Sequence, residues 1–128
     1  MRRIVLFLSL LVLALPAAAQ EWRTAPEYDL LLTSYAIQPK VLRLKAGEPV
    51  RLRFVNNSNE PHRFAAAAFF ARAELRERER TMVRRGSLEV APLSEQTLVL
   101  VPHAGRYRMT GGSVAQRLLG MNGRIVVE

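Results

Sequence analysis

Short stretches of alternating apolar and polar residues recur along most of this chain, and they predict β-strands. Residues 50–54, with the sequence Val-Arg-Leu-Arg-Phe, alternate strictly, which is typical of a strand with one buried and one solvated face. Further runs bounded by Pro, Gly, Ser or Asn predict strands over 28–33, 41–45, 88–90, 96–101, 106–109 and 124–127. Seven or so short strands joined by turns predict an all-β fold, a Greek-key β-sandwich with antiparallel strands.

One stretch breaks this β pattern. Residues 65–80 hold several alanines followed by a run of Glu and Arg, a composition that favours a helix. We therefore predict a helical insertion around 65–82, with the Arg/Glu run at 72–80 as its solvated face. We expect Phe69 and Phe70 in or over the core. One apolar helix face would bring together Ala68, Ala71, Leu75 and Met82.

The N-terminal residues have the organisation of a secretory signal peptide. Arg2 and Arg3 precede an apolar run over 4–15, and a proline and three alanines follow it, which predicts cleavage after Ala19. The apolar run is shorter than the ~20 residues that a membrane helix needs, so we expect no stable membrane span after cleavage. An uncleaved N-terminal anchor is the alternative.

The predicted organisation is a signal peptide over 1–19, a polar lead-in over 20–27 and a single domain over 28–128. A cleaved signal peptide predicts a periplasmic protein. The chain contains no cysteine, which excludes disulfides and any thiolate metal site. A small exported domain without disulfides suits a bacterial periplasm better than an extracellular, disulfide-bonded module.

The charge balance is strongly basic, with 19 Lys and Arg against 11 Asp and Glu, a net charge of +8. Removing Arg2 and Arg3 with the signal peptide leaves +6. Such a surface is typical of proteins that bind nucleic acid, an anionic membrane surface or an acidic protein. Predicted export argues against nucleic acid, which leaves an acidic partner, an anionic envelope surface or a plain soluble Arg-rich surface.

The titratable residues do not form a catalytic pattern. His62 and His103 are the only histidines, no serine lies in a nucleophile motif, and no paired carboxylates have a cleft-forming spacing. We therefore do not expect an enzyme.

Two stretches of the sequence resemble the bacterial cupredoxins, the blue-copper family that includes plastocyanin and azurin. The first runs from Leu44-Lys45-Ala46-Gly47-Glu48-Pro49-Val50 through Phe54-Val55-Asn56-Asn57 to Pro61-His62. The second runs from Gly105-Arg106-Tyr107 to Gly120-Met121-Asn122-Gly123 and is similar to the metal-binding loop of the family. The resemblance covers residues 28–128 and implies the Greek-key sandwich of the family.

The resemblance maps the four copper ligands of the family onto His62, Gly111, Gln116 and Met121. A blue-copper site needs a thiolate and two imidazoles, with a long thioether contact. Glycine and glutamine replace the expected Cys and second His, so the resemblance implies a degenerate type 1 site. Blue-copper electron transfer is therefore the least favoured function.

The two ligands that remain could still bind metal. An imidazole and a thioether form a soft pair that favours Cu(I), so we expect any metal at His62 and Met121, as a weak Cu(I) or Cu(II) site without blue colour. Met109, Met82 or His103 could add a third ligand. We discount His103, because it lies in the turn before the strand over 106–109, and that turn should be at the end of the sandwich opposite the ligand loop.

Two functions remain open from the sequence. The first is a periplasmic accessory or binding protein with an incomplete copper site, in metal handling or respiratory envelope chemistry. The alternative is a metal-free interaction module that docks by its Arg-rich surface onto an acidic envelope partner. Under either hypothesis, the expected partners are copper or iron transport proteins or respiratory envelope proteins.

Overall fold

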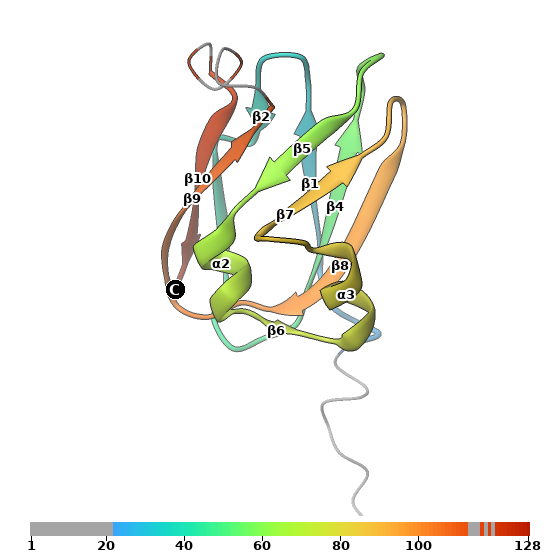
Figure 1. Ribbon diagram of the computed structural model, residues 1–128. Coiled ribbons are helices and arrows are strands. Elements are labelled where there is room, and N and C mark those ends of the chain that lie inside the picture. Colours follow the sequence, from blue (N-terminus) through green and yellow to red (C-terminus); the bar gives the residue numbers. More distant parts are fainter. Residues whose placement is uncertain (1–21, 113–115, 117, 119) are drawn as a thin grey trace, which may run out of the picture.

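The described residues, 22–112, 116, 118 and 120–128, form a two-layered β-sandwich in this computed structural model (Figure 1). The elements in chain order are β1 (Glu27–Leu32), β2 (Ile37–Gln38), β3 (Val41–Leu44), β4 (Val50–Asn56), β5 (His62–Ala65), α2 (Ala67–Arg72), β6 (Glu74–Leu75), α3 (Glu77–Met82), β7 (Ser87–Val90), β8 (Glu95–Val101), β9 (Gly105–Gly111) and β10 (Asn122–Val127). The predicted all-β sandwich is thus confirmed.

Two sheets of five strands make up the layers. The first sheet has the order β2-β1-β4-β8-β6 and the second has the order β3-β10-β9-β5-β7. The expectation of purely antiparallel sheets is wrong, because β1 pairs with β4 and β10 pairs with β3 in parallel. The chain crosses from β2 in the first sheet to β3 in the second and returns to the first sheet for β4, which then runs beside β1 in the same direction.

Alternation along the strands places apolar side chains between the sheets. In β4 every second residue is buried, as the strict pattern over 50–54 predicted. Aromatic side chains join the layers: the ring centroids of Phe54 and Phe64 lie 4.7 Å apart, and those of Phe69 and Tyr107 lie 5.5 Å apart. Such pairs add stabilisation beyond the burial of their area.

The predicted helical insertion consists of two short helices, α2 and α3, which Figure 1 shows together across the lower part of the sandwich. Between them β6 pairs with β8 and forms the edge of the first sheet. The apolar face that we predicted is wrong, because Ala68 and Ala71 are exposed. Phe69 and Phe70 are buried instead, as expected. A six-residue helix cannot present the long stripe that one continuous helix would have.

The predicted signal peptide and its cleavage site lie outside the described residues. Within the described ranges, no helix has the length and apolar character needed to cross a bilayer.

Candidate functional site

Three of the four mapped ligand positions meet at one end of the sandwich. His62 begins β5, Gly111 ends β9, and Met121 immediately precedes β10. Phe64 lies opposite Gly111 in the β5–β9 pair, and Asn122 lies opposite Thr110 in the β9–β10 pair. The pairing of β5, β9 and β10 therefore brings these three positions together at one end of these strands.

Backbone hydrogen bonds connect Gly111, Gln116 and Met121 directly. The Gly111 N–H donates to the Met121 carbonyl at 3.1 Å, and the Met121 N–H donates to the Gln116 carbonyl at 2.9 Å. A Cβ built on Gly111 would lie 2.8 Å from Cε of Met121. A side chain at position 111 would thus point at the thioether of Met121, which is fully buried.

His62 occupies the inner face of β5, two residues before the core residue Phe64. Its side chain is only 2% exposed, and neither Nδ1 nor Nε2 has a hydrogen-bond partner among the described residues. Leaving a buried polar group unpaired costs ~1–3 kcal/mol, so these two ring nitrogens are open to a water molecule or a ligand. It is the strongest ligand donor at this end of the molecule.

The loop that leads to His62 is organised by Asn56, the last residue of β4. The Asn56 amide donates to the carbonyls of Glu60, Val90 and Ala91 at 2.8–3.1 Å, and its Oδ1 accepts from the N–H and hydroxyl of Ser58. An Asn followed two residues later by Ser is the signal of an Asx turn. Asn56 thereby fixes β5 against β7 and positions His62.

The remaining sequence candidates add no clear third ligand. The Gln116 amide donates to the Ser34 carbonyl at 2.9 Å, which ties its segment to the turn after β1. Met109 is fully buried, and its Cε lies 2.5 Å from a Cβ built on Gly123, inside the β9–β10 pair. No cluster of three or more His, Cys, Asp or Glu exists within the described residues.

His103 is exposed in the turn before β9, at the opposite end of that strand from Gly111. His103 therefore lies away from the other mapped positions, as predicted. Met82 is partly buried and packs against the core. The site therefore offers one imidazole and one thioether.

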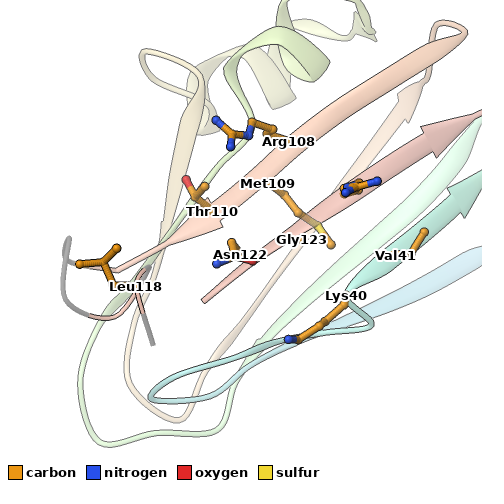
Figure 2. A pocket seen from close by; sticks show the side chains of 9 residues that line it. Lys40, Val41, Arg108, Met109, Thr110, Leu118, Asn122 and Gly123 are labelled. Atoms are coloured by element: carbon orange, nitrogen blue, oxygen red, sulfur yellow. The ribbon is translucent and has the colours of Figure 1, made fainter. Parts of the chain in front are cut away.

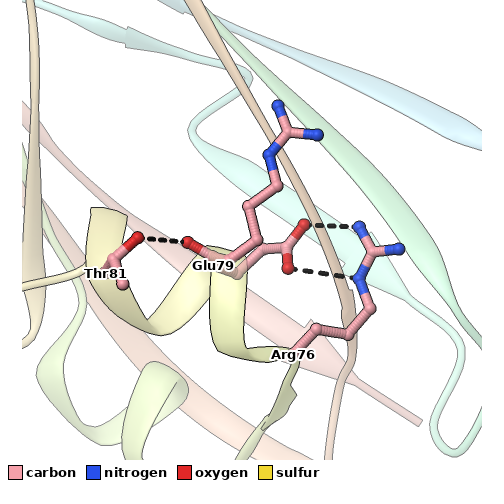
Figure 3. A network of polar contacts seen from close by, with 4 residues as sticks. Arg76, Glu79 and Thr81 are labelled. Carbon is pink, nitrogen blue, oxygen red and sulfur yellow. Dashed lines mark hydrogen bonds and ion pairs between the residues drawn. The ribbon is translucent and has the colours of Figure 1, made fainter.

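A second polar group lies at the other end of the molecule, in α3 (Figure 3). Glu79 is 1% exposed, which contradicts the expectation that the whole Arg/Glu run at 72–80 is solvated. Its carboxylate accepts two hydrogen bonds from the Arg76 guanidinium, at 2.5 and 3.1 Å. The same guanidinium lies 5.0 Å from the centroid of the Trp22 ring. This ion pair fixes α3 beside the first sheet and the lead-in.

Burial on its own raises the pKa of Glu79, but the hydrogen bonds from Arg76 and from the backbone N–H groups of Glu79 and Val99 outweigh it. The pKa of Glu79 therefore lies below its ordinary value. A carboxyl group with a lowered pKa stabilises the fold above its unfolded pKa, and this contribution disappears as the pH falls through the folded pKa.

We expect Glu79→Gln to destabilise the domain by about 1–3 kcal/mol at neutral pH, because it weakens a charge-assisted hydrogen-bond pair. The difference from the natural sequence should shrink as the pH falls below ~4, the ordinary range for Glu. Urea unfolding at several pH values measures it. Glu77→Gln, which changes an exposed residue of the same helix, is the control and should show little effect. A pH-independent loss for Glu79→Gln would contradict the assignment.

Comparisons with known proteins agree with the β-sandwich described above. The family model described as a cupredoxin-like domain matches residues 3–127 of the chain. A solved multi-copper oxidase from Pseudomonas thermotolerans is similar with a TM-score of 0.62 and 23% identity, over 80% of this chain and 29% of that one. This chain therefore spans less than a third of that oxidase. A search of curated proteins found no match.

Two auracyanin structures are similar over most of both chains. Auracyanin B has a TM-score of 0.56 and 18% identity, over 81% of this chain and 89% of that chain. The Na-dithionite reduced auracyanin of the photosynthetic bacterium Roseiflexus castenholzii has a TM-score of 0.58 and 15% identity, over 81% and 97%. At such low identities the likeness shows the fold.

Proposed function

This chain belongs to the cupredoxin-like domain family, and from that premise we propose that it is an accessory binding protein of the bacterial envelope with an incomplete, weak copper site. The observation that carries the proposal is the buried imidazole of His62, which has no partner among the described residues, at the same end as the buried thioether of Met121. Such a pair suits Cu(I).

The donor set explains why the site would be weak and without blue colour. Gly111 has no side chain, and the amide of Gln116 is engaged with the Ser34 carbonyl. A bound copper ion would supply a soft Lewis acid between the two remaining donors, His62 and Met121. Without a thiolate, intense visible absorption and tuned electron transfer are not expected. The protein's own part is to bury both donors and keep water from them.

The place of action follows from the predicted signal peptide, which would deliver the domain to the periplasm. A protein that holds copper weakly would exchange it with partners there. We propose a copper or iron transport protein or a respiratory envelope protein as the partner class.

A second candidate function is a metal-free interaction module that docks onto an acidic partner. The specific observation behind it is that the strands β3, β9 and β10 carry several exposed arginines and no Asp or Glu. This function would not require His62 to bind anything.

Copper titration tests the first function. Cu(I) at about ten times its dissociation constant should raise the melting temperature of the mature domain by roughly 5–10 °C, through binding to the folded state alone. His62→Ala should abolish the rise, and Met121→Leu, which nearly conserves the side-chain volume, should reduce it. Differential scanning calorimetry under a reductant is the measurement.

His103→Ala is the matched control, because it removes the other histidine, which is exposed and at the far end. It should leave the copper-induced rise unchanged. If generous copper left the melting temperature of the natural domain unchanged, the second function would be favoured.

A further inference from the structure

The outer face of the second sheet carries a group of arginines on three neighbouring strands. Side chains alternate between the two faces of a strand, so on β3, β9 and β10 a residue points outward where the residues before and after it point into the core. We call the exposed arginines at these positions the arginine face: Arg43, Arg106, Arg108 and Arg124. In the strand register Arg124 lies directly opposite Arg108.

These arginines form no ion pairs in the part of the chain that the structure describes. None of the four takes part in a salt bridge within the described residues, and β3, β9 and β10 contain no Asp or Glu. Like charges directly opposite each other in a sheet are destabilising. The fold therefore carries a local electrostatic cost on this face.

The first sheet provides a contrast within the same molecule. On its outer face Arg53 lies 3.7 Å from Glu27, 3.8 Å from Asp29 and 3.2 Å from Glu95. Arg53 is thus balanced by three carboxylates, while none of the four arginines of the arginine face has a salt bridge among the described residues.

An outward-facing valine lies between two of these arginines. Val126 points outward, with Arg106 opposite it on β9 and Arg43 opposite it on β3. It is nevertheless only 7% exposed, which we attribute to the aliphatic stems of these two arginines lying over it. Stems that already pack on the sheet lose less side-chain entropy when their guanidinium groups bind a partner.

A hollow of about 710 Å³ opens at one end of this face. Arg108, Arg124 and Lys40 line it with positive charge, and Figure 2 shows that Lys40 and Leu118 lie on opposite sides of Asn122. Leu118 is 83% exposed at its rim. Arginine is enriched at protein interfaces, and the exposed Leu118 offers a partner an apolar contact beside the basic hollow.

We propose that the arginine face docks an acidic protein surface, with partner carboxylates on the guanidinium groups and a partner side chain entering the hollow. The proposal rests on the second function above and locates its surface. Guanidinium groups pair with carboxylates through two parallel hydrogen bonds, which favours Arg over Lys. The hollow at one end of this face suits a protruding side chain of a protein, because a flat bilayer would leave it empty.

The test uses poly-L-glutamate as an acidic probe and the full mature domain labelled with ¹⁵N. Binding should shift the amide resonances of β3, β9 and β10 and should weaken as salt is added, because exposed charges are screened with a Debye length of ~10 Å at 0.1 M. Replacing two arginines, in the double variant Arg108→Gln and Arg124→Gln, should weaken binding about tenfold.

The matched control is the double variant Arg78→Gln and Arg80→Gln, which removes the same charge from exposed positions of α3. It should change the affinity less than twofold. Equal losses for both pairs, or absence of binding, would overturn the proposal. Binding to phosphatidylglycerol vesicles without binding to poly-L-glutamate would instead identify a membrane surface as the ligand.

Copper-induced stabilisation of the same variants separates this inference from the copper site. The double variant Arg108→Gln and Arg124→Gln should keep the copper response of the natural domain, whereas His62→Ala should keep poly-L-glutamate binding. Circular dichroism checks that each variant is folded. Loss of both properties in a folded variant would contradict two separate surfaces.

Discussion

Adding copper(II) to the domain with Gly111→Cys and Gln116→His should produce an intense blue colour that the natural sequence does not give. The two changes supply the thiolate and the second imidazole, and His62 and Met121 supply the rest of a blue-copper donor set. We expect copper affinity to rise by several orders of magnitude, because a deprotonated thiol is a far stronger ligand than a thioether alone. Visible absorption and copper titration are the measurements.

The local geometry allows this reconstruction at a modest cost. A Cβ at Gly111 would lie 2.8 Å from Cε of Met121, the far end of a flexible side chain that can move aside, and 3.0 Å from the carbonyl oxygen of Arg63, which would have to shift by a few tenths of an ångström. Gly111, unlike its neighbour Gly112, does not have a positive φ, so an L side chain is not strained there. At position 116, the change to His removes the hydrogen bond that the Gln116 amide donates to the Ser34 carbonyl.

Gly111→Ser with Gln116→His is the matched control, since it places a side chain of nearly the same size with oxygen in place of sulfur. It should stay colourless. If the cysteine variant bound copper but remained colourless, position 111 would not face the other three, and the mapping of the ligands would be wrong.

The fold could be predicted from the sequence where alternation is strict. The pattern over 50–54 became the central strand β4, with its buried positions as expected. The sequence could not predict the parallel pairing of β1 with β4, because strand partners depend on contacts between distant residues. Helix propensity over 65–82 was real but was interrupted where the edge of β8 paired with Glu74–Leu75.

The candidate site was reachable from the sequence only through the family resemblance. That resemblance led to His62 and Met121, which the structure places at one end of the sandwich. It did not reveal that the His62 ring nitrogens lack partners among the described residues, because burial and hydrogen bonding require coordinates. The role of Asn56 in fixing the preceding loop depends on the carbonyl of Val90, more than thirty positions away in the chain.

For the charged residues, too, the sequence shows the total charge, whereas their arrangement requires the fold. The net charge of +8 is visible in the sequence, and it leaves open an acidic partner, an anionic envelope surface or a plain soluble surface. The grouping of arginines on one face of the second sheet is not visible in the sequence, because Arg108 and Arg124 become neighbours only through the β9–β10 register. Similarly, Glu79 looks like one of several solvated charges until the fold buries it against Arg76.

Replacing Gly86 with Ala should destabilise the domain by about 3–5 kcal/mol, much more than the same change at Gly47. Both glycines have a positive φ, +73° and +76°, so each alanine pays a similar backbone strain. A Cβ on Gly47 would meet no atom within 4 Å, whereas one on Gly86 would lie 2.5 Å from Cα and Cβ of Ala67. The start of α2 would have to move.

The consequence extends into the core. The Ala66 N–H donates to the Gly86 carbonyl at 3.0 Å, and α2 carries Phe69 against Tyr107. Displacing α2 therefore loosens an aromatic contact between the helix and the second sheet. Urea unfolding of both variants provides the comparison, with about 1–2 kcal/mol expected for Gly47→Ala from the backbone term alone. Equal losses at the two positions would mean that α2 does not lie against Gly86 in solution.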